Sequence, residues 1–306
     1  MRAAQVVELG TPPITAEIEG DGGLEVAAVA LNPVDLAVAA GHFYGGHPPL
    51  PYVPGCEAVG RRDGARVYVF GDGHGTVKDG FLAERVDSSP GLETPVPDSL
   101  DDAVAAACGI AGVAGWVPVA TRAPVRPDDR VLVLAATGTV GTVALQAARV
   151  LGAARVVAAG RDAARLERLR DLGADETVVL DGEGLAERLR AACGGEGPTL
   201  VVDPLWGGVV PVAAEAAAPG ARIVHVGQSA GPEATLLSSH VRGKQLSILG
   251  HSNFALTDAE RGEAYRELTE HVAAGRIHLD VETFPLDRVA EAWDTQGRGA
   301  KAVVVL

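Results

Sequence analysis

A buried strand that leads directly into a glycine turn and a helix is the feature that most constrains the fold of this chain. Val131 to Ala135 is continuous apolar sequence, Gly138 and Gly141 follow it, and a helix is predicted over 141–151. A strand without polar alternation is buried on both faces, which is typical of a parallel sheet. Because strands and helices continue to alternate, we predict a doubly wound parallel α/β domain.

The alternation can be followed to about residue 250. The strands are predicted at 131–135, 155–159, 176–180, 200–203, 222–226 and 246–249. The helices between them are predicted at 141–151, 163–172, 185–192 and 210–218. An Ala-rich helix is expected earlier, over 101–121. The alternation then breaks, with a charged amphipathic helix at 258–274, a short helical stretch at 284–293 and a strand at 302–306.

The first hundred residues have a different texture. Turn signals rich in Gly, Pro and Asn recur at short intervals, and short β-prone runs such as Leu24–Leu31 and Arg66–Phe70 lie between them. This pattern predicts a small, irregular, mostly antiparallel domain with functional loops.

Composition and charge narrow the class of protein. The 306 residues are 47% hydrophobic but only 4% aromatic, and the net charge is -14, which opposes binding to nucleic acid. Cys56, Cys108 and Cys193 are far apart and read as reduced thiols. The first ten residues hold no apolar signal core, and we expect no apolar run near 18 residues. We therefore expect a soluble, cytoplasmic protein without a membrane partner.

The glycine turn has a chemical use besides packing. Gly138 lets the backbone approach a pyrophosphate, Gly141 lets the helix pack close to the strand, and the helix N-terminus offers free N–H groups. The first glycine of the G-x-G-x-x-G pattern is replaced by Ala136. We predict dinucleotide binding here, through Ala136, Gly138, Thr139, Val140 and Gly141. The alternative is a turn that only packs a βαβ unit.

The end of the second strand of this domain selects the cofactor. Enzymes that use NAD place an acidic residue there, on the ribose hydroxyl. This chain has Gly160 and Arg161, with Arg165 one helical turn later, and two guanidinium groups suit a 2′-phosphate. We predict NADPH rather than NADH. Asp162 is the counter-argument, because it could serve NAD if the strand ended later.

Several segments together resemble one family. They are Leu31–Asp35, Pro54–Gly60, the glycine turn with Gln146, Leu172–Asp175, Val202–Pro204 and Arg222–Gly227. In order and spacing the chain resembles the medium-chain dehydrogenase/reductase superfamily, in its zinc-independent quinone oxidoreductase branch. The resemblance implies a GroES-like, mostly β catalytic domain at 1–112 that 255–306 completes. It also implies a Rossmann domain at 113–254 and a homodimer.

The resemblance extends to the nicotinamide half of the cofactor. It implies contacts from Asp203, Pro204, Val226, Gly227 and Gln228, and from His251, Ser252 and Asn253. His251 could equally be an ordinary loop histidine. Ala114 stands where relatives usually have Thr, so one hydroxyl contact to the cofactor is missing.

The zinc ligands of relatives are not present. Zinc-dependent relatives have Cys where this chain has Asn32, His where it has Cys56, and a third ligand that aligns with Ile110. Asn and Ile do not ligate zinc, so no metal is expected. His42, His47, Cys56 and Glu57 lie near one another in the sequence, but we do not expect them to form a metal site.

Without a metal, hydride delivery to a quinone or other conjugated carbonyl is easier than alcohol oxidation. The resemblance brings Asn32, Tyr44 and Tyr52 to the cleft: Asn32 and Tyr44 as orienting or donating groups, Tyr44 and Tyr52 as lining of the substrate pocket. Tyr44 could instead be a packing aromatic. An enoyl, alkenal or biosynthetic tailoring reductase remains an alternative, as does a non-enzymatic NADPH-binding protein.

Overall fold

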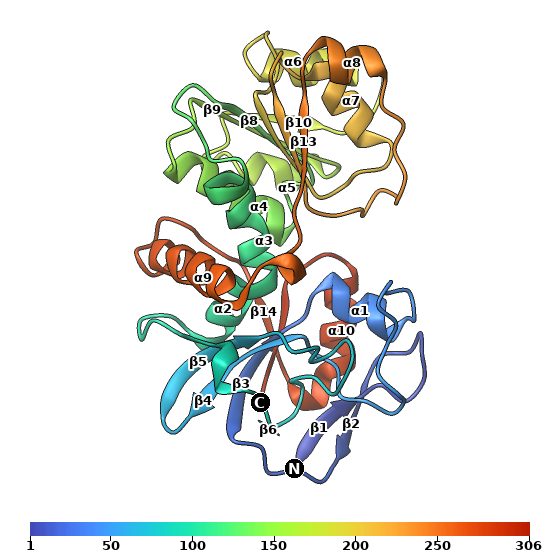
Figure 1. Ribbon diagram of the computed structural model, residues 1–306, viewed down its shortest axis with the longest axis vertical. Coiled ribbons are helices and arrows are strands. Elements are labelled where there is room, and N and C mark those ends of the chain that lie inside the picture. The colour runs from blue at the N-terminus through green and yellow to red at the C-terminus, as the bar shows by residue number, and fades with distance from the viewer. The chain divides into compact units, whose positions relative to one another are not determined.

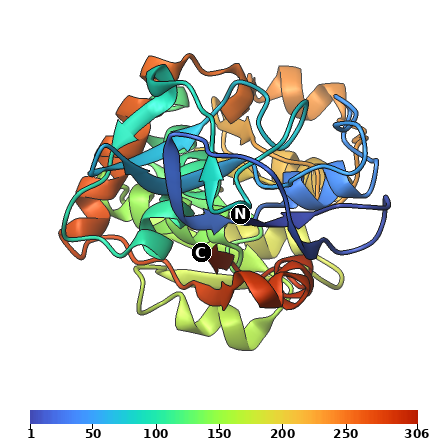
Figure 2. The ribbon, with the colours of Figure 1, turned by 90° about the horizontal axis from the view of Figure 1, so that it is seen from below.

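The computed structural model describes residues 1–306 and divides the chain into two compact units. Unit 1 comprises Met1–Val113, Leu256–Gly275 and Leu279–Leu306, and unit 2 comprises Ala114–Ala255 and Arg276–His278. The boundaries predicted from the sequence lie next to these. Both chain ends belong to unit 1 (Figures 1 and 2).

Unit 2 is built on one parallel sheet in the strand order β10-β9-β8-β11-β12-β13. Its strands are β8 (Arg130–Val133), β9 (Arg155–Gly160), β10 (Glu176–Val179), β11 (Leu200–Asp203), β12 (Arg222–His225) and β13 (Ser247–Gly250). Its helices are α3 (Val113–Val117), Pro118–Arg122, α4 (Thr139–Val150), α5 (Ala163–Arg168), α6 (Leu185–Ala192), α7 (Val209–Ala216) and α8 (Ser238–Gly243), with a turn at Asn253–Ala255. Figure 1 shows α4, α5, α6, α7 and α8 around the sheet. The predicted doubly wound α/β fold is confirmed.

The core of unit 2 explains why its strands carry no polar alternation. Leu132, Val157, Val201 and Ile223 leave the central strands on the face that α6 and α7 cover, and all four are fully buried. The intervening residues of the same strands are also buried, because α4 and α5 belong to the opposite layer.

Unit 1 contains a seven-stranded sheet in the order β14-β15-β3-β4-β5-β7, with β6 paired to β3. Its strands are β3 (Leu24–Ala30), β4 (Glu57–Arg62), β5 (Ala65–Phe70), β6 (Arg85–Val86), β7 (Glu93–Pro95), β14 (Glu282–Pro285) and β15 (Ala302–Val305). β1 (Arg2–Gln5) and β2 (Ile14–Glu17) form a separate antiparallel pair. The helices are α1 (Pro33–Ala39), α2 (Asp102–Ala107), Cys108–Gly112, α9 (Asp258–Ala273) and α10 (Val289–Gly297), with short turns at Pro90–Leu92 and Leu286–Arg288.

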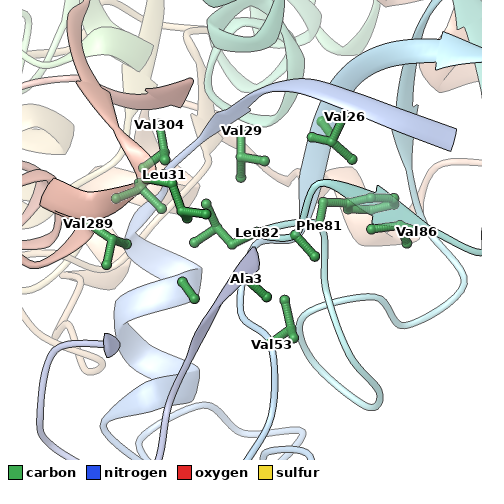
Figure 3. Close-up of a cluster of buried hydrophobic side chains, with 14 of the residues drawn as sticks. Ala3, Val26, Val29, Leu31, Val53, Phe81, Leu82, Val86, Val289 and Val304 are labelled. Atoms are coloured by element: carbon green, nitrogen blue, oxygen red, sulfur yellow. The ribbon is translucent and has the colours of Figure 1, made fainter. Parts of the chain in front are cut away.

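The core of unit 1 joins segments that are far apart in the sequence (Figure 3). Val29 from β3, Leu82 from the loop after β5, Val304 from β15 and Val289 from α10 all lie in this cluster. Because β15 pairs with β3, the last residues of the chain complete the sheet that the first hundred residues begin.

Three details differ from the sequence-based expectation. The helix predicted over 101–121 breaks at Gly109, where φ is -64° and ψ is -117°. The stretch 284–293 was predicted to be helical, but it begins in β14 and becomes helical only from Leu286. The expectation that no apolar run approaches 18 residues was wrong. The helical segment Asp102–Arg122 is long and apolar enough to span a membrane, but 78% of its most apolar stretch is buried inside the structure.

Asp129 connects the amino ends of three strands in unit 2. Its carboxylate accepts hydrogen bonds from Arg222 of β12 (2.5 Å), from the Thr199 hydroxyl before β11 (2.7 Å) and from the backbone N–H of Arg126 (2.7 Å). Burial alone would raise the pKa of Asp129, but these donors outweigh it and lower the pKa below its usual value.

We therefore expect Asp129→Asn to lower the free energy of unfolding by about 1–3 kcal/mol near neutral pH. A carboxyl whose pKa is lowered on folding contributes stability above its unfolded pKa and loses it as the pH falls through the folded pKa. The difference in unfolding free energy between the natural chain and Asp129→Asn should therefore become smaller below about pH 4. Urea unfolding at successive pH values measures this, with the exposed Asp98→Asn as the control, expected to change stability by less than about 0.5 kcal/mol. An equal deficit in both variants would contradict the prediction.

Candidate functional site

The glycine turn of unit 2 has the geometry of an anion-binding helix N-terminus. Ala135 takes a left-handed φ of 49°, and Gly138 precedes the first turn of α4, which no side chain caps. The first N–H groups of a helix have no partner inside it, and the residues that carry them here, Thr139 and Val140, are half-buried. The turn can therefore accept a pyrophosphate on its backbone.

Glycine is required at Gly141 by close packing. A Cβ on Gly141 would lie 2.5 Å from the Ala135 carbonyl oxygen, whereas one on Gly138 would lie 3.6 Å from the same atom. Ala136, the residue in place of the first glycine, is buried and donates its N–H to the Ala159 carbonyl (3.0 Å). Ala136 therefore shapes the turn from inside, and its side chain does not face a ligand.

The charges at the end of β9 are arranged around this turn. β9 ends at Gly160, and Arg161 and Arg165 are exposed. The Arg165 guanidinium donates to the Thr137 carbonyl (3.0 Å), which holds it beside the glycine turn. Asp162 accepts the Arg165 N–H (3.0 Å) as the N-cap of α5. The acidic residue thus caps a helix, and the strand does not extend to it as the NAD alternative required.

The carboxyl ends of β11 and β12 bring the next predicted residues together. Pro204, Val226, Gly227 and Gln228 lie at this edge and are partly or fully exposed. Asp203 differs, because it is fully buried and its Oδ1 accepts the N–H groups of Leu205 and Trp206, both at 2.9 Å. The side chain of Asp203 therefore shapes the loop after β11 and does not reach a surface where a cofactor could bind.

The segment after β13 forms a small polar cluster of its own. His251 Nε2 lies 2.9 Å from Asn253 Oδ1, and Ser252 between them is exposed. Burial lowers the pKa of His251. Contact of these residues with the cofactor stays a prediction.

Asn32 in unit 1 has no free amide proton. Its Nδ2 donates to the Ala30 carbonyl (3.0 Å) and to Glu57 Oε1 (2.7 Å), and its Oδ1 accepts from Lys301 Nζ (2.8 Å). The side chain is 1% exposed. This geometry argues against the prediction that Asn32 donates to a substrate, because both of its donors are already used.

The buried charges around Asn32 were missed in the sequence. Glu57 accepts from Tyr68 (2.8 Å) and from the N–H of Ile110, at the break after Gly109. Lys301 Nζ lies 3.9 Å from Glu57. Burial raises the pKa of Glu57 and lowers that of Lys301. No sequence signal marked Lys301, because a lysine before an apolar strand usually lies in solvent.

The two predicted tyrosines lie in different environments. Tyr44 is 88% exposed and contacts Phe43, with ring centroids 4.4 Å apart. Tyr52 is 1% exposed, and its hydroxyl is buried without a hydrogen-bond partner. The structure therefore argues against Tyr52 as a residue that lines a substrate pocket, whereas Tyr44 is free to do so.

No group of three or more His, Cys, Asp or Glu side chains is placed to hold a metal ion. The sequence cluster of His42, His47, Cys56 and Glu57 does not gather into such a group. All three cysteines are buried and free, and burial raises the pKa of Cys108 to about 12. These thiols are therefore neutral and poorly suited to act as nucleophiles.

Comparison with known proteins gives a consistent family. The family model described as zinc-binding dehydrogenase matches residues 139–272. The rat quinone oxidoreductase is 26% identical over 332 residues, covering 100% of this chain and 98% of that protein. The structure of a quinone oxidoreductase from Thermus thermophilus, solved also with NADPH, has a TM-score of 0.81 at 29% identity and covers 100% of both chains.

A second kind of relative is much longer. A phenolphthiocerol/phthiocerol polyketide synthase of Mycobacterium tuberculosis is 29% identical over 290 residues. The match covers 90% of this chain, and the chain spans only 13% of that protein.

The two glycines of the turn give separable predictions. Gly141→Ala is expected to lower the free energy of unfolding by about 1–3 kcal/mol, because its methyl group would meet backbone atoms. Gly138→Ala should fold as the natural chain does but bind a dinucleotide at least about tenfold more weakly, because the methyl group stands where the phosphate approaches. Urea unfolding and a fluorescence titration with dinucleotide measure the two effects. Unchanged binding by Gly138→Ala would place the phosphate elsewhere.

Proposed function

Since this chain belongs to the medium-chain dehydrogenase/reductase superfamily, in its quinone oxidoreductase-like branch, we propose that it transfers hydride from NADPH to a quinone or another conjugated carbonyl without zinc. The observation that carries the proposal is the uncapped helix N-terminus at Gly138, with Arg165 fixed beside it. The turn suits the pyrophosphate and the guanidinium suits a 2′-phosphate, which NADPH has and NADH lacks.

The residues of the chain divide the work of binding. The backbone of 138–141 holds the pyrophosphate, and Arg161 and Arg165 neutralise the 2′-phosphate. Pro204 and the 226–228 segment, at the same edge of the sheet, contact the nicotinamide half. When bound, NADPH supplies hydride to the electron-poor carbon of the acceptor.

The negative charge that develops on the acceptor oxygen needs a hydrogen-bond donor. Tyr44 is the donor that we propose, because its phenol is exposed while both amide protons of Asn32 are used internally. Zinc independence rests on the donor set, because Asn32 and Cys56 stand where zinc-dependent relatives have Cys and His.

A second candidate acceptor has an observation in its favour. The similarity to a polyketide synthase over 90% of this chain favours reduction of an enoyl substrate in a biosynthetic pathway. The same hydride chemistry would serve both acceptors, so the choice depends on the substrate pocket.

We also propose a cytoplasmic homodimer that takes small molecules and has no nucleic-acid or membrane partner. β13 is an open edge of the unit 2 sheet, and Leu237 nearby in the sequence is 58% exposed. An unpaired strand edge is a template for pairing with a second chain.

An acceptor screen tests the reaction. We expect NADPH oxidation, followed by the absorbance of the reduced nicotinamide, with a benzoquinone or naphthoquinone. Alkenals and a crotonyl thioester are the comparison substrates. Higher kcat/KM on the thioester than on every quinone would favour the second candidate. Tight NADPH binding without turnover of any acceptor would instead indicate a non-enzymatic NADPH-binding protein.

Exchange of the two arginines tests the cofactor. Arg161→Ala with Arg165→Ala should weaken NADPH binding by about 10- to 100-fold, because the two exposed guanidinium groups together are expected to contribute about 1.4–2.8 kcal/mol of phosphate binding. NADH binding should change by less than about threefold, because NADH has no 2′-phosphate. Arg168→Ala, an exposed arginine in the same helix, is the control. An equal loss for both dinucleotides would sink the NADPH assignment.

A further inference from the structure

Two buried polar atoms without a hydrogen-bond partner face each other at the carboxyl end of the unit 2 sheet. They are Asp203 Oδ2 and His225 Nδ1, and they lie 3.8 Å apart. Asp203 and His225 are opposite each other in the β11–β12 register, so both side chains leave the sheet on the same face. The separation is too long for a hydrogen bond, although buried polar atoms are nearly always paired. A single proton held between Asp203 Oδ2 and His225 Nδ1 would give both atoms a partner if they moved closer together.

Trp206 lies over this pair in a strained backbone conformation. Its ring packs on the His225 imidazole with centroids 4.3 Å apart. Its φ is 54°, in the left-handed region that a bulky residue seldom adopts. Such strain persists where the surrounding structure enforces it, and it is most common at functional sites. The enforcing contacts here are the two hydrogen bonds from Leu205 and Trp206 to Asp203 Oδ1.

The loop after β11 and the loop after β12 are joined by hydrogen bonds. Val226 N–H donates to the Asp203 carbonyl (2.8 Å), and Ala230 N–H donates to the Leu205 carbonyl (2.8 Å). The Ser229 hydroxyl donates to the Pro204 carbonyl (3.1 Å). These bonds connect the backbone of 203–205 directly to residues 226–230.

We propose that Asp203 and His225 are positioning residues that share a proton and thereby set the 226–228 segment against the nicotinamide half of NADPH. The inference rests on the proposed function, which assigns that segment to the cofactor. When the proton is present, Nδ1–H donates to Oδ2 and the two loops are drawn together. When it is lost, the imidazole is neutral and any Nδ1–H bond to Oδ2 is no longer charge-assisted, so the two loops are held together less tightly. Burial raises the pKa of Asp203, as expected for a carboxyl with one unpaired oxygen.

Asp203 is the acidic group that faces His225. The polar and charged groups on the neighbouring elements have other partners. From β13, the residue opposite His225 is Gly250, whose carbonyl accepts from Arg122 (2.9 Å). His251 directs its ring to Asn253. Lys244, at the end of α8, donates from its Nζ to the carbonyls of residues 214, 215 and 217 at the end of α7.

The chain offers variants that change the proton and little else. Asp203→Asn keeps an oxygen for the Leu205 and Trp206 N–H groups but removes the charge. His225→Phe keeps a ring under Trp206 but cannot hold a proton. His240→Gln, a histidine on α8, is the matched control. Thermal unfolding of each variant checks that it folds.

The first measurement needs no cofactor. Trp206 emission, obtained as the difference from Trp206→Phe, is followed in the free chain from about pH 5 to about pH 8. We expect a transition in the natural chain and in His240→Gln, an altered transition in Asp203→Asn, and none in His225→Phe. No transition in the natural chain, or the same one in His225→Phe, overturns the shared proton.

The second measurement is the dissociation constant of NADPH over the same pH range. Relative to His225→Phe, the natural chain should bind roughly fivefold or more tightly at the acidic end, with no difference at the alkaline end. The same pH dependence in both chains overturns the positioning role. A chain that binds no NADPH at any pH would refute the proposed function, whereas the emission transition still decides whether the pair shares a proton.

Discussion

Parallel hydrogen bonding between β8, β11 and β12 is the constraint on which the rest of unit 2 depends. In a parallel sheet all carboxyl ends meet at one edge, so the loops after these three strands must be neighbours. The glycine turn, the Asp203 loop and the 226–228 segment are far apart in the sequence, yet this pairing brings them to one edge. Asp129 ties the opposite ends of the same strands together, which fixes their register.

Unit 1 depends on a different constraint, because it buries charged side chains that must pair with one another. Lys301, Asn32 and Glu57 form one hydrogen-bonded cluster with almost no exposure. Removal of one partner from such a cluster leaves an uncompensated buried charge, which is costly. The cluster also explains Gly109, where a Cβ would lie 1.9 Å from Glu57 Oε2. The helix breaks there because the carboxylate takes the space and accepts the next N–H.

The sequence predicted those features that depend on neighbouring residues. The strand–turn–helix at 131–151, the position of β9 to within one residue at its end and the alternation through β13 all follow from periodicity and glycine chemistry. Features that depend on distant contacts were missed. The Asn32 side chain has all its hydrogen-bonding groups occupied only because Lys301 comes from the end of the chain. Tyr52 is buried only because the core of unit 1 packs around it. The sequence did offer one signal for His225, because it is a polar residue near the end of an otherwise apolar strand at 222–226.

The sequence by itself determined the fold class, the family, the glycine turn and the charges placed beside it, because each is encoded within a few turns or strands. Only the tertiary structure decided which polar side chains remain free to act. Tyr44 is exposed and Asn32 is not, and Asp203 turns into the protein toward His225. The reason is that hydrogen-bond partners and burial come from segments that meet only when the sheets form, so no local pattern can report them.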